Sequence, residues 1–417
     1  MDVIIQPRKL SGQITPPPSK SQAHRLVIGA ALSGGESLIE NIDFSQDILA
    51  TLEAMEQLGA KWKNLGEGKI KIFGVGAHAP NGEAGELPHI DCAESGSTLR
   101  FLIPIALALT GGGVFTGHGR LMQRPQEPYF RLFREKGIDY CLAGDTLTVR
   151  GRLPAGDYAL AGNVSSQFFT GLLYALSLVP GESTVRSTTV LESRSYIDMT
   201  LDALGFFGSQ VQELSGPCPA FAVTGRGCLQ PRNCAVEADW SQAAFYYSAL
   251  GLGNLLEIGG MNPDSRQGDR VIARFYEALR CPGEVTLNVE DCPDLVPPLA
   301  VHAALRGAGN LTHIVGAGRL RMKESDRLQS VTAALNSLGA QVQEESAGLT
   351  IAGSDALRGG TVDPCSDHRI AMMVAVAATA CREPVTILGA QCVRKSYPGF
   401  WTDYAALGGQ ITMEESQ

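Results

Sequence analysis

The chain has 417 residues, of which 44% are hydrophobic and 18% are charged, and its formal net charge is -9 at pH 7. At about 150 residues per domain this length suggests two or three domains, and the composition is that of an ordinary globular protein. The acidic balance argues against an extended nucleic-acid surface or an acidic-membrane surface, although cations gathered locally could still bind a small anion.

The sequence also argues against a membrane or metal protein. The N-terminal stretch MDVIIQPRKL lacks the apolar core of a signal peptide. The longest apolar runs, FLIPIALAL and IAMMVAVAATA, are shorter than the roughly 20 residues that cross a bilayer, so we expect buried helices there. The ten cysteines form no C-x-x-C pair and the seven histidines no H-x-x-x-H pair. We therefore expect reduced thiols, a cytoplasmic location and no metal site.

Three serine-rich segments stand directly before apolar runs. In chain order they are PPPSKSQAHR (16–25), ESGSTLR (94–100) and SSQF (165–168). Each is typical of a helix N-terminus, where unpaired N–H groups and the positive end of the helix dipole can bind an anion. Capping of the helix by serine is the simpler explanation of each segment taken singly.

Basic segments follow further along the chain. They are RPQEP (124–128), RMKESDRL (321–328), DHRIAMM (367–373) and RKSYP (394–398). Solvated ion pairs suffice to explain Arg321, Arg394 and Asp326. Arg369 leads into an apolar helix, so it is expected at the edge of the core, where a partner must neutralise it. Because no nucleotide-binding glycine loop occurs, these cations and the helix starts are expected to hold two anionic ligands.

A junction of helix, glycine and strand recurs along the whole chain. The six copies stand at Gly59, Gly137, Gly208, Gly283, Gly339 and Gly408, with successive gaps of 78, 71, 75, 56 and 69 residues. Glycine suits the left-handed position that ends a helix. Several of the strands expected after these glycines, KIKIF, TLTVR, FAVTG and LTIAG, alternate as half-buried strands do. The spacing predicts six units of mixed strands and helices, packed as two globes.

Nine motifs together resemble one known family. PPPSKSQAHR, ESGSTLR, RPQEP, SSQF, YIDMT, CPDLVP, RMKESDRL, DHRIAMM and RKSYP occur in the order and spacing of the 5-enolpyruvylshikimate-3-phosphate (EPSP) synthases, over nearly the whole chain. The resemblance implies an α/β fold of two similar domains, each of three βαβαββ units in an inside-out α/β barrel, hinged about an interdomain active site. It implies one domain from residues 1–18 and 238–417, and another from residues 19–237.

The resemblance also implies the reaction and its residues. Such enzymes transfer the enolpyruvyl group of phosphoenolpyruvate to the 5-hydroxyl of shikimate 3-phosphate and release phosphate, in aromatic amino-acid biosynthesis. The residues expected to bind shikimate 3-phosphate are Lys20, Ser21, Arg25, Ser165, Ser166, Gln167, Ser193, Asp294 and Lys323. The residues expected to bind phosphoenolpyruvate are Lys20, Gly96, Arg124, Gln167, Arg327, Arg369 and Lys395. Arg319 and Glu94 stand where relatives often carry asparagine, so their contacts, and inhibition by glyphosate, stay open.

Three of these residues are expected to be catalytic. We expect Asp294 to take the hydroxyl proton, and either Glu324 or Lys20 to transfer protons at the methylene carbon. No metal or organic cofactor is expected, because fixed cations and exclusion of water can stabilise the developing charge. The protein is expected to act as a monomer, without nucleic-acid or membrane partners.

Two alternative functions fit the same fold. A UDP-N-acetylglucosamine 1-carboxyvinyltransferase resembles this chain but has a Lys-Asn opening and a cysteine in the loop near Arg124. Here the opening is Lys20-Ser21 and the loop has no cysteine. A non-catalytic protein that binds phosphate ligands would keep the anion-binding residues but would not need Asp294 and Glu324.

Overall fold

The computed structural model describes residues 1–76 and 86–415. The chain divides into two compact units. The central unit is Lys20–Glu237, and the terminal unit combines Met1–Ser19 with Ala238–Gln417. Each unit has its own hydrophobic core.

The central unit contains three four-stranded sheets of one topology, ordered β14-β3-β5-β4, β6-β7-β9-β8 and β10-β11-β13-β12. In each sheet the first two strands are parallel and the other neighbours antiparallel. The strands are β3 (Glu36–Glu40), β4 (Lys61–Gly66), β5 (Lys69–Phe73), β6 (His89–Asp91), β7 (Gly112–Thr116), β8 (Asp139–Ala143), β9 (Thr146–Arg150), β10 (Asp157–Leu160), β11 (Gly181–Ser187), β12 (Gln210–Leu214), β13 (Ala220–Gly225) and β14 (Cys234–Ala235).

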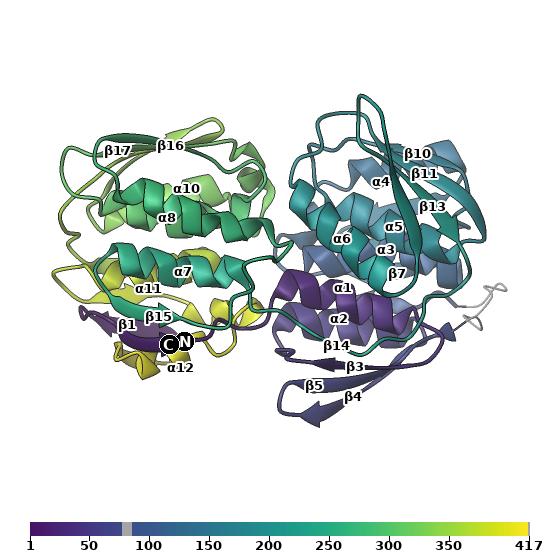
Figure 1. The fold of residues 1–417 in the computed structure, drawn as a ribbon, viewed down its shortest axis with the longest axis horizontal. Coiled ribbons are helices and arrows are strands. Elements are labelled where there is room, and N and C mark those ends of the chain that lie inside the picture. The colour runs from purple at the N-terminus through teal and green to yellow at the C-terminus, as the bar shows by residue number, and fades with distance from the viewer. Residues whose placement is uncertain (77–85, 416–417) are drawn as a thin grey trace. The chain divides into compact units, whose positions relative to one another are not determined.

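Helices lie against these sheets in the interior of the central unit (Figure 1). They are α1 (Lys20–Ala31), α2 (Gln46–Gln57), α3 (Gly96–Thr110), α4 (Glu127–Lys136), α5 (Gln167–Leu178) and α6 (Arg194–Phe206), with a short 3-10 turn η2 (Leu121–Gln123). The predicted buried helix at FLIPIALAL is α3, and the predicted strands KIKIF, TLTVR and FAVTG are β5, β9 and β13, whose residues alternate in burial. These predictions are confirmed.

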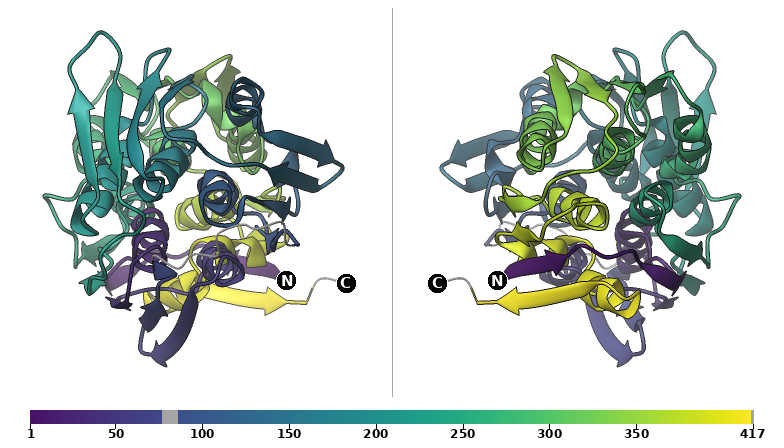
Figure 2. Two further views of the ribbon diagram at one scale, coloured as in Figure 1. Left: turned by 90° about the vertical axis from the view of Figure 1, so that its right-hand side faces the viewer. Right: turned by 90° about the vertical axis from the view of Figure 1, so that its left-hand side faces the viewer.

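The terminal unit repeats this topology in the sheets β16-β17-β19-β18 and β20-β21-β1-β22. Its strands are β1 (Asp2–Gln6), β2 (Ser11–Ile14), β15 (Leu255–Ile258), β16 (Glu284–Asn288), β17 (Leu311–Val315), β18 (Gln341–Glu345), β19 (Gly348–Ala352), β20 (Gly360–Val362), β21 (Val385–Ile387) and β22 (Gln410–Glu414). Strand β1 pairs antiparallel with both β21 and β22, so the first and last strands lie side by side (Figure 2).

The helices of the terminal unit are α7 (Trp240–Gly251), α8 (Ile272–Arg280), α9 (Val296–Ala304), α10 (Arg327–Ser337), α11 (His368–Ala378) and α12 (Phe400–Ala406). The short 3-10 turns are η3 (Gly268–Val271), η4 (Pro293–Leu295), η5 (Gly318–Met322) and η6 (Ala390–Lys395). Every residue of α11 is buried, as the apolar run in the sequence predicted.

One repeat of the terminal unit is shorter than predicted. Its sheet has two strands, β2 and β15, where the others have four. After α8 the described chain passes through Gly283 directly into β16 of the next sheet, without a hairpin. The prediction of three complete βαβαββ units in this domain is therefore wrong for one of them. The missing hairpin also explains why the gap from Gly283 to Gly339 is 56 residues, the shortest of the five.

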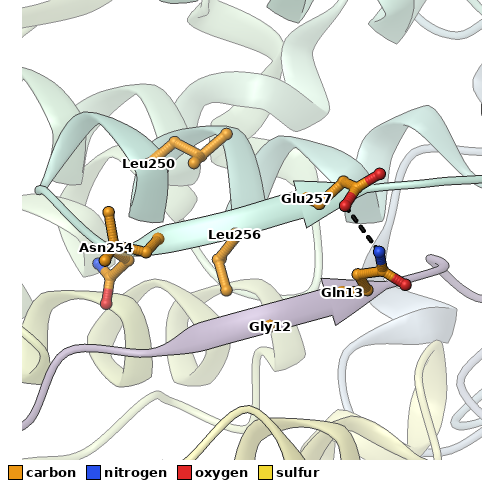
Figure 3. A pocket seen from close by; sticks show the side chains of 7 residues that line it. Gly12, Gln13, Leu250, Asn254, Leu256 and Glu257 are labelled. Atoms are coloured by element: carbon orange, nitrogen blue, oxygen red, sulfur yellow. Dashed lines mark hydrogen bonds between the residues drawn. The ribbon is translucent and has the colours of Figure 1, made fainter.

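The shortened repeat leaves part of its sheet uncovered. Figure 3 shows the shallow pocket there, which is lined by Gly12, Gln13, Leu250, Asn254, Leu255, Leu256 and Glu257. Leu255 is 77% exposed. The six glycines of the repeat all adopt positive φ, from 66° at Gly137 to 102° at Gly59. The repeat inferred from these glycines is thus real even where its hairpin has been lost.

Candidate functional site

The serine-rich segments of the central unit form the starts of α1, α3 and α5. The Oγ atom of Ser95 caps α3 by accepting the backbone N–H of Thr98 at 3.1 Å. None of the three helices carries an acidic residue in its first turn. Their positive dipole ends are therefore not offset by a first-turn carboxylate, which suits them to an anionic ligand.

Gly96, Arg124 and Gln167 come together at the starts of α3 and α5. The side-chain amide of Gln167 accepts from Arg100 Nη1 at 2.9 Å and donates to Ser97 Oγ at 3.0 Å. A Cβ atom at Gly96 would lie 2.9 Å from Arg124 Nη1 and 3.6 Å from Gln167 Oε1. Glycine at this position therefore lets the Arg124 guanidinium approach the first turn of α3.

Lys20, the first residue of α1, is held by a carboxylate that the sequence reasoning missed. Its Nζ atom lies 2.6 Å from Oδ2 of Asp47, a buried residue in the first turn of α2. No local feature of the sequence pairs the two residues, because Asp47 is 27 positions away from Lys20. Asp47 fixes the ammonium group of Lys20 at the start of its helix.

A chain of buried hydroxyl groups joins three helix starts. His24 Nδ1 lies 2.8 Å from Thr51 Oγ1, which lies 2.7 Å from Thr98 Oγ1. These residues belong to α1, α2 and α3. Burial, together with the charges of Lys20 and Arg25, lowers the pKa of His24 well below its usual value. A neutral imidazole therefore joins α1 to α2 near the starts of these helices.

Arg25 connects α1 to α6. Its guanidinium donates to Ser21 O at 2.6 Å, to Thr200 Oγ1 at 2.9 Å and to Tyr196 O at 2.9 Å. Burial lowers its pKa to about 10, so it stays cationic at neutral pH. These three hydrogen bonds go to protein atoms, and binding of shikimate 3-phosphate by Arg25 remains a prediction.

The predicted serines lie at helix starts of the same unit. Ser165 and Ser166 precede α5, and Ser166 is buried. Ser193 precedes α6, is buried and has a left-handed backbone with φ of 55°. A non-glycine residue in this conformation is uncommon and occurs more often at functional positions. Ser21, next to Lys20, lies in the first turn of α1.

In the terminal unit, Arg327 lies at the centre of a group of carboxylates. It is 1% exposed and opens α10. Its Nη1 donates to Asp294 Oδ1 at 3.0 Å, its Nη2 to Glu324 Oε2 at 2.7 Å and its Nε to Asp367 Oδ2 at 2.9 Å. Such a buried cation is stable only because each face of the guanidinium fork has an anionic partner.

Asp294 is shared between several cations. Besides Arg327, it accepts from Arg369 Nη2 at 3.0 Å, and Lys323 Nζ lies 3.8 Å away. Burial acts to raise the pKa of Asp294, but the charges of Arg369, Lys323 and Arg327 outweigh it and hold this pKa well below the usual range. For the ammonium group of Lys323, burial has the opposite effect and lowers the pKa. The carboxylate of Asp294 is therefore ionised at neutral pH.

Arg369 and Lys395 are the two other predicted phosphoenolpyruvate ligands of the terminal unit. Asp367 caps α11 by accepting the backbone N–H of Arg369 at 3.0 Å. Lys395 is buried at the end of η6, which packs against α11. The next residue, Ser396, accepts from Gln242 in the first turn of α7 at 3.1 Å.

Arg319 and Glu94, whose ligand contacts the sequence left open, both lie against other parts of the protein. Arg319 Nη2 donates to the carbonyl oxygen of Glu290 at 2.6 Å. The carboxylate of Glu94 lies against Gly119, where an added Cβ would be 2.9 Å from Glu94 Oε2. Arg321 forms half-exposed ion pairs with Asp326 and Glu344, the ordinary role expected for it.

Other possible sites are few in the described part of the chain. None of the predicted site residues lines the pocket over β2 and β15. Among residues 1–76 and 86–415, no group of three or more histidine, cysteine or acidic side chains could hold a metal ion. All ten cysteines are free thiols. No helix in these residues is long and apolar enough to cross a membrane.

Known proteins match the chain over its full length. The family model of EPSP synthase (3-phosphoshikimate 1-carboxyvinyltransferase) matches residues 4–404. A curated 3-phosphoshikimate 1-carboxyvinyltransferase from Clostridium kluyveri is 43% identical and covers 98% of each chain, and one from Clostridium perfringens is 42% identical over 99% of each. A solved EPSP synthase from Acinetobacter baumannii has the same fold, with a TM-score of 0.79, 24% identity, and coverage of 100% of each chain. By these full-length matches, the chain belongs to the EPSP synthase family.

Proposed function

We propose that the chain transfers the enolpyruvyl group of phosphoenolpyruvate to the 5-hydroxyl of shikimate 3-phosphate and releases phosphate. This reaction is a step of the shikimate pathway, and the curated relatives are named for it. The observation that carries the assignment is their match along the whole chain, 43% identical over 98% of its length in one case.

The charges of the two groups of residues suit these substrates. Phosphoenolpyruvate and shikimate 3-phosphate each carry a phosphate group and a carboxylate. Two unit charges 4 Å apart in a partly buried site interact by about 4 kcal/mol, so each anion needs fixed cations. We propose that Arg124 and Gln167 in the central unit, and Arg327, Arg369 and Lys395 in the terminal unit, bind phosphoenolpyruvate. Arginine can hold carboxylate or phosphate through two parallel hydrogen bonds, which also orients the ligand.

Asp294 is the proposed base for the 5-hydroxyl. It is ionised, because Arg369, Lys323 and Arg327 hold its pKa low. A carboxylate with so low a pKa is a weak base as long as the charges of these three cations act on it without a competing anion. Substrate anions that share Arg327 and Arg369 would raise its pKa toward the range of a useful base.

The remaining proton transfers concern the methylene carbon. As the 5-hydroxyl oxygen attacks the adjacent carbon of phosphoenolpyruvate, the methylene gains a proton and a tetrahedral ketal phosphate forms. Loss of a proton from the new methyl group then expels phosphate. We propose Glu324 or Lys20 for these transfers. Glu324 lies 2.7 Å from Arg327 and shares it with Asp294, while Lys20 is held by Asp47.

Phosphate release tests the function directly. The purified chain is incubated with both substrates, with each alone, and with UDP-N-acetylglucosamine in place of shikimate 3-phosphate. We expect phosphate release only in the incubation with both substrates. There, one phosphate should be released for each enolpyruvyl ether detected by mass spectrometry. Release with UDP-N-acetylglucosamine would favour the sister transferase. Binding of both substrates without release would indicate a non-catalytic binding protein.

We also expect the chain to act as a monomer in the cytoplasm. The location rests on the ten scattered free thiols. Light scattering during size-exclusion chromatography should give a mass near 44.2 kDa, and twice that mass would contradict the monomer.

A further inference from the structure

Lys395 lies in a tight turn of the terminal unit that closes at Tyr397. The backbone N–H groups of Ser396 and Tyr397 both donate to the carbonyl oxygen of Val393, at 3.1 and 2.8 Å. Lys395 is the last residue of η6 and is only 3% exposed. Because its side chain is enclosed, the place of its ammonium group follows the backbone of this turn. Contacts that hold the turn therefore also place Lys395.

A short chain of hydroxyl groups joins this turn to α7 and α12. Tyr397 is 2% exposed, and its hydroxyl donates to Oδ2 of Asp403 in α12 at 2.6 Å. The hydroxyl oxygens of Tyr397 and of Tyr246 in α7 lie 2.8 Å apart. Since the single hydroxyl proton of Tyr397 goes to the carboxylate, Tyr246 is the donor of this second bond. The chain thus runs in one direction, from Tyr246 through Tyr397 to Asp403.

A second side-chain contact holds the same turn against α7. Nε2 of Gln242 donates to Oγ of Ser396 at 3.1 Å, and both residues are buried. The first turn of α7 is fixed in its own right, because the backbone N–H of Gln242 donates to the capping carboxylate of Asp239 at 3.1 Å. The two residues that follow Lys395 are therefore both bonded to this helix through their side chains.

Packing alone does not require these hydroxyl groups. The ring of Tyr397 lies against Phe400, with ring centroids 5.5 Å apart. Phenylalanine in place of both Tyr397 and Tyr246 would fill nearly the same space without burying polar atoms. Replacing both partners of a buried hydrogen bond by apolar groups of the same shape can be nearly neutral for stability. What the hydroxyl groups add is orientation, since a displaced Tyr397 would break two hydrogen bonds at once.

We propose that Tyr397 is a positioning residue, which fixes Lys395 for a bound anion through its hydrogen bonds to α7 and α12. This inference rests on the proposed function, and specifically on Lys395 as a ligand of phosphoenolpyruvate. Tyr397 acts through the backbone of the turn rather than on the substrate. Loosening the turn should therefore weaken the binding of phosphoenolpyruvate more than it slows turnover, because the proposed base, Asp294, belongs to another element.

The kinetic test removes one hydroxyl group with Tyr397→Phe. A full ångström of misplacement costs about a hundredfold, so a smaller shift of Lys395 should raise the KM for phosphoenolpyruvate about tenfold. The kcat and the KM for shikimate 3-phosphate should stay near the wild-type values. Tyr404→Phe is the matched control, because Tyr404 is another buried tyrosine of this region whose hydroxyl donates to Ala375 O in α11 at 3.0 Å. It loses a hydrogen bond that does not involve the turn and should keep the wild-type KM.

Asp403 provides a second pair of variants, which serves if Tyr397→Phe does not fold. Asp403→Ala removes the acceptor of the Tyr397 hydroxyl, whereas Asp403→Asn keeps an oxygen that can accept from it. We expect the KM for phosphoenolpyruvate to rise in Asp403→Ala and to return most of the way in Asp403→Asn. Adding Tyr246→Phe to Tyr397→Phe should raise this KM no further, because Tyr246 acts only through Tyr397.

Hydrogen exchange of the free protein gives a readout that needs no substrate. The backbone N–H groups of Ser396 and Tyr397, which both donate to Val393, report on the turn directly. They should exchange about tenfold faster in Asp403→Ala than in Asp403→Asn, as for the loss of one hydrogen bond that holds a local structure. Tyr404→Phe should leave their exchange as it is in the wild type.

The outcomes separate the inference from the proposed function. If the wild type releases phosphate, an unchanged KM for phosphoenolpyruvate in Tyr397→Phe and Asp403→Ala would overturn the inference alone. An equal rise of this KM in Tyr404→Phe, or unchanged exchange at Ser396 and Tyr397, would also overturn it. A wild type that releases no phosphate would instead overturn the proposed function, and with it the role of Tyr397 in substrate binding.

Discussion

The two units use the same repeat but treat their helix starts in opposite ways. In the central unit α1, α3 and α5 begin with serine, glycine, lysine or glutamine, and their first turns carry no acidic residue. In the terminal unit the corresponding starts of α7 and α11 are capped by Asp239 and Asp367, and Asp294 lies just before α9. These three helix starts of the central unit stay available to an anion, whereas carboxylates cap the starts of α7 and α11 in the terminal unit.

The difference shows how anion binding can be built in two ways on one topology. In the central unit, helix ends and a few cations can receive an anion directly. In the terminal unit, the arginines are already bound to carboxylates, so an anion must share them with protein groups. Binding there is therefore sensitive to the charge of each carboxylate, whereas the central unit depends on shape and hydroxyl contacts.

The largest expected effect concerns the proposed base of the terminal unit. Asp294→Asn keeps the size of the side chain but removes the charge that accepts a proton. We expect turnover to fall about 10²- to 10⁴-fold, as for loss of a general base, with a much smaller change in KM. Steady-state kinetics with both substrates measures this, and Asp264→Asn serves as control. Unchanged turnover would end the assignment of Asp294 as base.

The second effect tests whether the carboxylates of the terminal unit need their central cation. Arg327→Ala leaves Asp294, Glu324 and Asp367 without that partner, which should reduce the free energy of unfolding by about 3–5 kcal/mol. Arg321→Ala, in the same sequence motif but with half-exposed partners, should lose less than about 1 kcal/mol.

Urea unfolding followed by tryptophan fluorescence can assign this loss to a unit. Trp240 and Trp401 belong to the terminal unit and Trp62 to the central one. A Trp62→Phe background therefore reports on the terminal unit alone. Equal losses in the two arginine variants would contradict the central role of Arg327.

The third effect is the loss of stability in acid, which should be larger in the terminal unit than in the central unit. Because the pKa of Asp294 is lowered in the folded state, its stabilising effect is present above the unfolded pKa of about 4 and is lost as the pH falls below it. The starts of α1, α3 and α5 are joined mainly by hydroxyl and amide groups that do not titrate there. Hydrogen exchange at pH 5 and pH 3 should show protection falling more in residues 238–415 than in residues 20–76 and 86–237. A uniform loss would contradict the contrast between the units.

The smallest effect concerns shape in the central unit. Gly96→Ala would place a methyl group 2.9 Å from Arg124 Nη1, the far end of a flexible side chain. The guanidinium can move aside, so we expect normal folding and a KM for phosphoenolpyruvate about tenfold higher, less than the roughly hundredfold cost of a full ångström of misplacement. Gly205→Ala, where no atom lies within 4 Å, is the matched control. An unchanged KM would show that Arg124 does not need this approach.

Features repeated along the chain were predictable from the sequence. Six glycines at similar spacing predicted the repeat, because each ends a helix by the same backbone geometry. The apolar runs predicted α3 and α11 because a helix buried on all sides has no polar face. The alternating run TLTVR likewise predicted β9.

Features that depend on distant partners were not predictable. Asp47 contacts Lys20, 27 positions away, and nothing local in the sequence requires this pair. Arg327 of α10 likewise meets Asp294 and Asp367, which are 33 and 40 positions away, only in the folded unit. The lost hairpin after α8 left a trace in the short gap of 56 residues, but the gap alone does not say which element is missing.

The position of β1 has a consequence for synthesis on the ribosome. Residues 20–237 emerge as one continuous stretch and can fold as soon as they are made. Strand β1 leaves the ribosome long before its two sheet neighbours, β21 and β22, which begin at Val385 and Gln410. The nascent chain must therefore carry β1 unpaired until both neighbours have been made, with the apolar side chains of this strand open to chaperone binding.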